Sequence, residues 1–170
     1  MPEADGFAEF VAGRSRELLR AGWLLTGDWA LAEDLVQTAL AATWPRWSQL
    51  ARADRPDLYV RRVMVTTFLR WRRRRWNAEI STGRLPDRPD RSDALAQVDV
   101  RASVAHALAV LPPRQRVVVV LRYFADLSEA ETARVMGCSV GAVKSHAAKA
   151  FSRLRGVPGL AEIMTGGGTS

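Results

Sequence analysis

The sequence predicts an all-α protein made of two small helical domains joined by a flexible linker, with a helix-turn-helix in the second domain. Apolar residues recur at spacings of three, four and seven through residues 5–76 and again through 94–156. Residues 77–93 lack that periodicity and contain glycine, prolines and charges of both signs. Gly137 and Ser139 stand where a tight turn between two short helices needs them. The predicted division is residues 1–76, 77–93, 94–156 and a disordered tail, 157–170.

Three helices are expected in the first domain, and turn residues mark their limits. They span residues 5–25, 29–44 and 57–76. Gly27 should end the first helix and Asp28 should cap the second. Pro45 should close the second helix, and Asp57 should cap the third.

The second domain shows stronger helix punctuation. Helices are expected over residues 94–111, 117–124, 129–136 and 140–155. Pro112 and Pro113 precede the β-branched run at 117–120 and favour a helix there over a strand. Ser128 and Glu131 have the spacing of a capping box.

The last two helices form the predicted helix-turn-helix, whose second helix would lie in the DNA major groove. The residues expected in its buried seam are Ala133, Val135, Met136, Val140, Val143, Ala147 and Leu154. The residues left exposed, and therefore predicted to contact DNA, are Lys144, Ser145, Ala148 and Lys149. The alternative is that the cations of this helix are a solvated face near its C-terminus, where the helix dipole favours them.

The positive charge is concentrated in one segment. The chain has a formal net charge of +7, and residues 52–77 account for all of it, with nine arginines against two aspartates. Clustered cations indicate a polyanionic partner, either nucleic acid or an anionic membrane surface. The membrane reading needs an apolar face free to insert, whereas Val63, Val65, Phe68 and Leu69 are required for the helical bundle.

Other classes of function lack the residues that they need. The longest apolar runs fall far short of the roughly 20 residues that span a bilayer, so we expect a cytoplasmic protein. Cys138 is the single cysteine, and His106 and His146 are far apart, so we expect no disulfide, metal or other cofactor. No carboxylate cluster, phosphate-binding loop or activated nucleophile indicates an enzyme.

Aromatic residues are interleaved with the arginines of the third helix. Ring faces for stacking bases, together with cations along a backbone, suit opened or single-stranded DNA. The helix spacing of Tyr59, Phe68 and Trp44 favours the core for these three side chains instead. His106 is likewise expected in the core or at its boundary.

In this order, these elements resemble an extracytoplasmic-function (ECF) sigma factor of the sigma-70 family. The motifs that carry the resemblance are Ala32–Leu40, Trp44, the basic helix from Tyr59 to Trp76, the proline-containing linker, and Leu111–Val117 leading into the helix-turn-helix. Tyr-Val-Arg-Arg at 59–62 and Trp-Arg-Arg-Arg-Arg-Trp at 71–76 are similar to short actinobacterial members. The resemblance covers residues 7–155.

The resemblance implies a partner for each surface. The residues that would dock on core RNA polymerase, at the β′ clamp helices, are Glu33, Asp34, Leu35 and Gln37; the β subunit is implied as a further contact. The residues that would bind and open the −10 promoter element are Gln49, Arg52, Arg55, Arg61, Arg62, Arg70, Arg72, Arg73, Arg74 and Arg75. Residues 49–55 take the place where the family captures a flipped base. Lys144, Ser145, Ala148 and Lys149 would read the −35 element.

Two functional hypotheses follow. The first is a promoter-specificity subunit of RNA polymerase, without catalysis and monomeric when free. The second is a stand-alone helix-turn-helix regulator, which would usually dimerise, although no dimerisation segment is evident. The resemblance leaves an anti-sigma factor open as a further partner. Thr66 and Ala148 depart from the residues common in relatives, so base readout should differ in detail.

Overall fold

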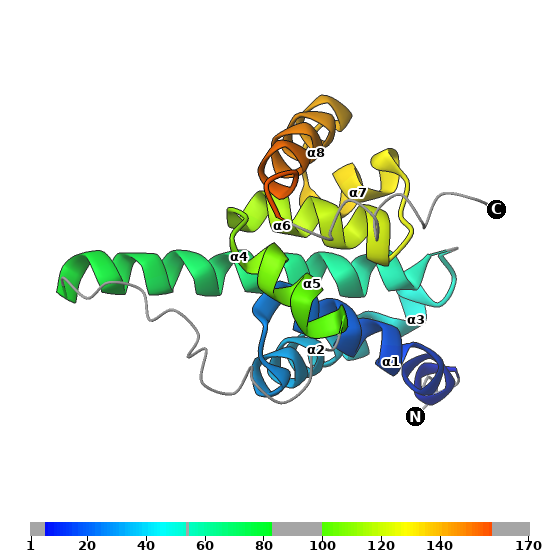
Figure 1. Ribbon diagram of the computed structural model, residues 1–170. Helices are drawn as coiled ribbons and strands as arrows, with labels where there is room; N and C mark the ends of the chain where they lie inside the picture. The colour runs from blue at the N-terminus through cyan, green and yellow to red at the C-terminus, as the bar shows by residue number, and fades with distance from the viewer. Residues whose placement is uncertain (1–5, 54, 83–99, 158–170) are drawn as a thin grey trace.

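The structure, a computed structural model, describes residues 6–53, 55–82 and 100–157, and these residues are helical apart from short turns. Figure 1 shows the long helix α4 between two groups of helices. The N-terminal part comprises α1 (Phe7–Thr26), α2 (Trp29–Thr43), the 3₁₀ turn η1 (Trp44–Arg46), α3 (Trp47–Leu50) and α4 (Pro56–Thr82). The C-terminal part comprises α5 (Val100–Ala109), α6 (Pro113–Val119), the π-turn η3 (Val120–Phe124), α7 (Glu129–Met136) and α8 (Val140–Leu154). The two predicted helical parts are confirmed, and the predicted linker and tail fall largely outside the described residues.

The turn between α1 and α2 forms as predicted. Gly27 adopts a left-handed conformation with φ 72°, and its N–H donates to the Trp23 carbonyl at 2.7 Å. The Asp28 carboxylate accepts a hydrogen bond from the Leu31 N–H at 3.0 Å. This cap satisfies one of the free N–H groups at the start of α2 and fixes where the helix begins.

The second helix ends where Pro45 predicts, because α2 stops at Thr43 and the chain continues as the separate 3₁₀ turn η1, whose first turn tolerates the proline. The predictions for Asp57 and the end of the third helix differ from the structure. Asp57 is not a cap but lies inside the first turn of α4, where it pairs with Arg55. Helix α4 also continues to Thr82, past the expected end at Trp76.

The C-terminal part follows the predicted punctuation closely. Pro113 occupies the first turn of α6, and the valine run after it is helical rather than extended. The helix then widens into η3, where the Ala125 N–H donates to the Val120 carbonyl at 3.0 Å. This wider turn was not predicted, since no residue type in the run marks a π-turn.

The two parts share one hydrophobic core. Buried Leu25, Met64 and Phe68 of the N-terminal part belong to the same cluster as buried Leu108 and Val120 of the C-terminal part. Helix α4 contacts α6 and α7, and α1 contacts α5 and η3. The C-terminal part therefore rests on α1 and α4, and the end of α4 projects beyond the body (Figure 1). Within the described ranges, no helix is both long and apolar enough to cross a membrane.

Candidate nucleic-acid interface

The helix-turn-helix is built by two capped helices around a glycine turn. The Ser128 hydroxyl accepts from the Glu131 N–H at 3.0 Å, and the Glu131 carboxylate accepts from the Ser128 N–H at 2.9 Å, as the capping box predicts. Gly137 has φ 66° and ends α7. The Ser139 hydroxyl then accepts from the Ala142 N–H at 3.0 Å and starts α8. These contacts set the angle at which α8 leaves the turn.

The predicted seam of the motif is largely buried. Ala133, Val135, Val143 and Leu154 are buried, and Met136 and Ala147 are half-buried. Val140 is the exception, with 37% of its surface exposed, because it is the first residue of α8 and lies beside the turn.

The four side chains predicted to contact DNA lie together on the outer face of α8. Lys144, Ser145, Ala148 and Lys149 are all exposed. The Lys144 Nζ atom lies 3.7 Å from a Glu129 oxygen, and such an exposed ion pair contributes little to stability. In Figure 1 α8 lies on the side of the molecule away from α1 and α2, so this face is open to a duplex.

The two histidines and the single cysteine of this half lie in different environments. His106 is exposed, not in the core, because the buried side of α5 is made by Val104, Ala107 and Leu108. His146 is half-buried, and burial, followed by the charges of Arg114 and Lys149, lowers its pKa. Cys138 is a free, half-buried thiol in the turn.

The arginines of α4 divide into an exposed group and a buried member. Arg62, Arg70, Arg73, Arg74 and Arg75 are exposed, and Arg72 is half-buried. Gln49 and Arg52, before the helix, are exposed as well. The exposed side chains of α4 continue onto its projecting end, where Trp76 is 60% exposed. This arrangement can present a row of cations and one ring face to a nucleic-acid backbone.

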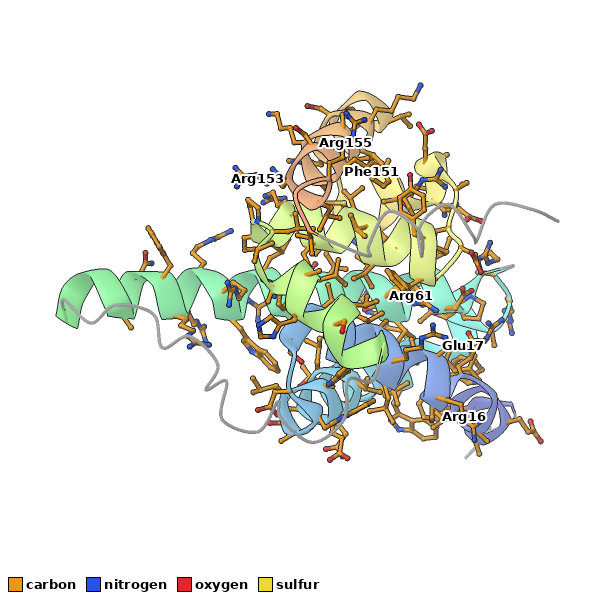
Figure 2. All side chains as sticks on the ribbon, viewed as in Figure 1. Arg16, Glu17, Arg61, Phe151, Arg153 and Arg155 are labelled. Atoms are coloured by element: carbon orange, nitrogen blue, oxygen red, sulfur yellow. The ribbon has the colours of Figure 1, made fainter. Side chains whose placement is uncertain are left out.

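Arg61 does not lie with the others. Only 5% of its side chain is exposed, and its Nη2 atom lies 3.9 Å from Glu17 of α1 (Figure 2). Burial lowers its pKa, although Asp57 and Glu17 oppose that effect. Its position joins α1 to α4 in the interior, and no feature of the sequence separates it from exposed Arg62.

Arg55 links the two halves of the protein. Its guanidinium donates to the Asp57 carboxylate at 3.2 and 3.1 Å and also to Glu131 of α7. These contacts raise its pKa, chiefly through the hydrogen bond from Arg55 to Asp57. For Glu131, the Ser128 backbone hydrogen bond is the largest influence and lowers the carboxyl pKa, with Arg55 adding to it. Both side chains therefore stay ionised at the seam, the contact surface between the N-terminal and C-terminal parts.

The aromatic residues near α4 are partly core and partly surface. Phe68 is 2% exposed, as predicted, and Tyr59 is half-buried with the Arg46 guanidinium 5.9 Å from its ring centroid. Trp44 is 49% exposed, which contradicts a core position, because it lies at the end of α2 and meets Phe7 only edge to face. Trp47, which was not singled out for the core, is buried against Phe7 and Phe10.

The predicted polymerase-docking face is the outer side of α2. Glu33, Asp34 and Gln37 are exposed there, whereas Leu35 is fully buried against the core. Sequence reasoning missed Trp29 and Leu31, which leave 56% and 41% of their surfaces exposed at the start of the same helix. Both residues lie in the first turn of α2, where the Trp29 ring stacks on Trp23 of α1 with 5.1 Å between the ring centroids.

The described part of the chain holds no group of three or more histidine, cysteine, aspartate or glutamate side chains that could hold a metal ion.

Comparison with known proteins identifies the family. The family described as "Sigma-70, region 4" matches residues 101–154. An RNA polymerase sigma-E factor from Streptomyces coelicolor is 43% identical over 155 residues, which cover 91% of this chain and 87% of that protein. One from Streptomyces antibioticus is 44% identical over 149 residues, covering 88% and 82%. The chain belongs to the ECF sigma factors of the sigma-70 family.

Solved structures agree with the fold. The sigma factor RpoE from Bartonella quintana, in complex with the anti-sigma factor NepR, has a TM-score of 0.66 at 23% identity, over 86% of this chain and 94% of that chain. CnrH, in complex with the cytosolic domain of CnrY, has a TM-score of 0.65 at 21% identity, over 92% and 89%.

As an ECF sigma factor, this protein is a non-enzymatic subunit of RNA polymerase that directs transcription initiation, so the stand-alone regulator hypothesis is set aside.

Proposed function

We propose that this ECF sigma factor docks on core RNA polymerase through α2, binds and opens the −10 element with α4 and the loop before it, and reads the −35 element with α8. The observation that carries the proposal is the outer face of α8, where Lys144, Ser145, Ala148 and Lys149 are all exposed directly after a capped turn. In a helix-turn-helix, the N-terminal half of the second helix is the part that reaches base edges.

The docking surface consists of the exposed members of the α2 set. Glu33, Asp34 and Gln37 form a polar, acidic face on a protein whose net charge is +7, and such a face favours a protein partner and repels DNA. Leu35 supports it from below by packing into the core. The partners are the β′ clamp helices, with the β subunit as a further contact.

The −10 surface is the exposed row on α4 together with Gln49 and Arg52. Guanidinium groups bind phosphate through two parallel hydrogen bonds, and their spacing along one helix follows a backbone. Extruding a base from the duplex costs a few kcal/mol, and contacts between that base and residues 49–55 must offset this cost. Arg61 contributes by holding α4 to α1, and Arg55 is engaged by Glu131 in this arrangement.

An anti-sigma factor is a further candidate partner. The solved Bartonella quintana sigma factor of similar fold is bound to one, NepR. Binding to polymerase and to chromosomal promoters would take place in the cytoplasm.

Run-off transcription with purified core RNA polymerase, measured together with core binding, tests the assignment. Asp34→Lys should reduce core affinity, because it reverses a charge on the docking face. Lys144→Glu with Lys149→Glu should retain core binding but reduce transcription from −35-dependent promoters by at least tenfold, because each lost phosphate or base contact is worth about 1 to 3 kcal/mol.

Arg153→Glu with Arg155→Glu is the matched control, because both residues are exposed at the end of α8 and the double variant makes the same change in net charge. It should leave −35-dependent transcription within about twofold of the parent. Equal losses in all the α8 variants, or loss of core binding by the Lys144 and Lys149 variant, would show that the roles are assigned to the wrong surfaces.

A further inference from the structure

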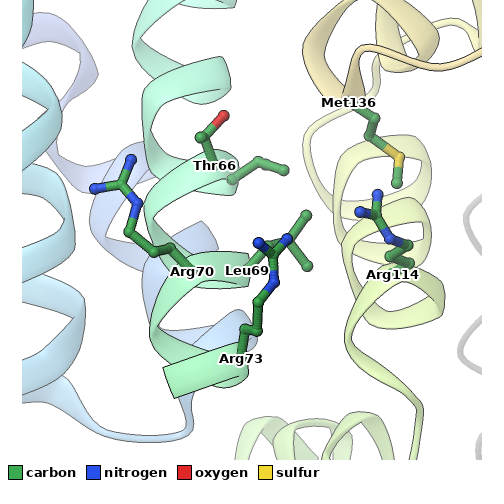
Figure 3. A pocket seen from close by; sticks show the side chains of 7 residues that line it. Thr66, Leu69, Arg70, Arg73, Arg114 and Met136 are labelled. Carbon is green, nitrogen blue, oxygen red and sulfur yellow. The ribbon is translucent and has the colours of Figure 1, made fainter. Parts of the chain in front are cut away.

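A small cavity lies where α4 meets α6 and α7. Its volume is about 220 Å³. Arg70 and Arg73 of α4 and Arg114 of α6 line it, together with Thr66 and Met136. Figure 3 shows Arg73 and Arg114 on opposite sides of the gap between the two helices, with Thr66 about two turns before Arg73 on α4. The walls of the cavity therefore come from both halves of the protein.

The charge of the cavity is uncompensated within the described part of the chain. The ion pairs found there use Arg14, Arg55, Arg61 and Lys144, and none joins a carboxylate to Arg70, Arg73 or Arg114. Arginine stays protonated in proteins, so three positive charges line this space, and Arg73 and Arg114 face each other across it (Figure 3). All three side chains are exposed, so an anion from solvent can reach them.

A second pair of positive charges lies close together where the two halves meet. Burial, followed by the charge of Arg72, lowers the pKa of Arg116 to about 10. Arg72 belongs to α4 and Arg116 to α6, so cations face each other across the seam at a second place. At the opposite end of the seam the pairing is different, because Arg55 there meets the carboxylate of Glu131.

We propose that this cavity binds the phosphate groups of a small polyanion, a di- or triphosphate either free or carried on a nucleotide. Guanidinium forks match phosphate oxygens, and the Thr66 hydroxyl can donate one more hydrogen bond. The volume lies below the roughly 300 Å³ of sites that enclose drug-sized molecules, so the cavity takes the phosphates and leaves any attached base outside. Arg114 lies outside the surface assigned to promoter DNA, and this assignment gives it a role.

A polyphosphate in this position would bridge the two halves. It would contact α4 through Arg73 and α6 through Arg114, so it binds the packed arrangement more tightly than a separated one. It would also occupy Arg73, which the −10 phosphates need. The site would therefore couple the concentration of a small anion to promoter binding.

Thermal unfolding of the full chain with inorganic pyrophosphate is the direct test, at an ionic strength held constant with sodium chloride. Saturating pyrophosphate should raise the Tm by about 2 °C or more, because a ligand of the folded state stabilises it by mass action. Arg114→Gln should lose at least half of that rise. Arg134→Gln is the matched control, because Arg134 is exposed on α7 and does not line the cavity, and it should keep the whole rise. Equal rises in all three proteins, or no rise in the parent, would overturn the proposal.

A second arm separates a free polyphosphate from a DNA phosphate. Fluorescence anisotropy of a labelled single-stranded oligonucleotide should show that pyrophosphate displaces it from the parent protein. Arg114→Gln should bind the oligonucleotide as tightly as the parent and need several-fold more pyrophosphate for displacement. If Arg114→Gln instead loses oligonucleotide affinity and keeps the parent's sensitivity to pyrophosphate, the cavity holds nucleic acid and the small-ligand site is refuted. The thermal unfolding measurements do not depend on the −35 and −10 assignments, so failure of those leaves this inference standing.

Discussion

Arg116 makes the most buried polar contact between the two halves. Its Nη1 atom donates to the Leu25 carbonyl of α1 at 2.6 Å, and its Nη2 atom donates to the carbonyls of Ala109 and Leu111 at 3.0 and 3.3 Å. The guanidinium also lies 5.9 Å from the Phe68 ring centroid. Three carbonyls from two chain segments therefore depend on one side chain, and a planar fork reaches them where a single ammonium cannot.

Arg116→Lys should lower the free energy of unfolding by roughly 2 to 3 kcal/mol, because it leaves buried carbonyls without a donor. Urea denaturation measures the change. Arg134→Lys makes the same chemical change at an exposed position of α7 and should alter stability by less than about 0.5 kcal/mol. A loss no larger for Arg116→Lys than for Arg134→Lys would mean that the carbonyls find other donors.

Residue patterns that act locally could be predicted from the sequence, whereas burial set by tertiary packing could not. The α8 contact residues follow from helix spacing next to a capped turn, and all four are exposed as expected. Arg61 is buried, and nothing in its immediate neighbours distinguishes it from exposed Arg62. Which side of a helix meets a second helix depends on residues far away in the chain.

At the scale of elements, glycine and proline could be placed from the sequence. Gly27 and Gly137 were placed correctly as turn residues because a positive φ is a local requirement. Pro45 was assigned to the end of the second helix, and α2 ends at Thr43 as expected; the 3₁₀ turn η1 that follows was not predicted, since a proline in a first turn is also compatible with a new helical turn.

Helix α1 contains two glycines whose replacement should have opposite effects. A Cβ on Gly22 would lie 3.3 Å from backbone and side-chain atoms of Ala32, at the crossing of α1 and α2, whereas a Cβ on Gly13 would meet nothing within 4 Å. Gly13→Ala should stabilise the protein by about 0.5 to 1 kcal/mol through helix propensity. Gly22→Ala should destabilise it by about 1 kcal/mol or more, because α2 must move as a unit to make room. Urea titrations of the two variants measure both changes in the free energy of unfolding. A stabilising Gly22→Ala would show that the contact between α1 and α2 has room for a methyl group.

At the scale of the whole molecule, the packed arrangement and the proposed promoter contacts impose different distances. Promoter positions −35 and −10 are about 25 base pairs apart, or roughly 85 Å of duplex at ~3.4 Å per base pair. A compact body of this length has a radius of gyration of only about 15 Å. Helices α4 and α8 therefore cannot reach both elements while the C-terminal part rests on α1 and α4, and the seam should open when the protein acts on a promoter.

Cross-linking across the seam tests this requirement. Arg55 and Glu131 contact each other from opposite halves, so Arg55→Cys with Glu131→Cys, in a Cys138→Ala background, allows a short reducible bis-maleimide to join them. The cross-linked protein should retain core binding through the exposed face of α2 but lose at least tenfold in run-off transcription, because the two promoter elements cannot both be reached. Reduction of the linker should return run-off transcription to the level that the double-cysteine protein shows before cross-linking. Comparison with this level controls for the loss of the Arg55–Glu131 pair. Undiminished transcription by the cross-linked protein would show that α4 and α8 serve the promoter without separating, and that the packed arrangement is itself the active one.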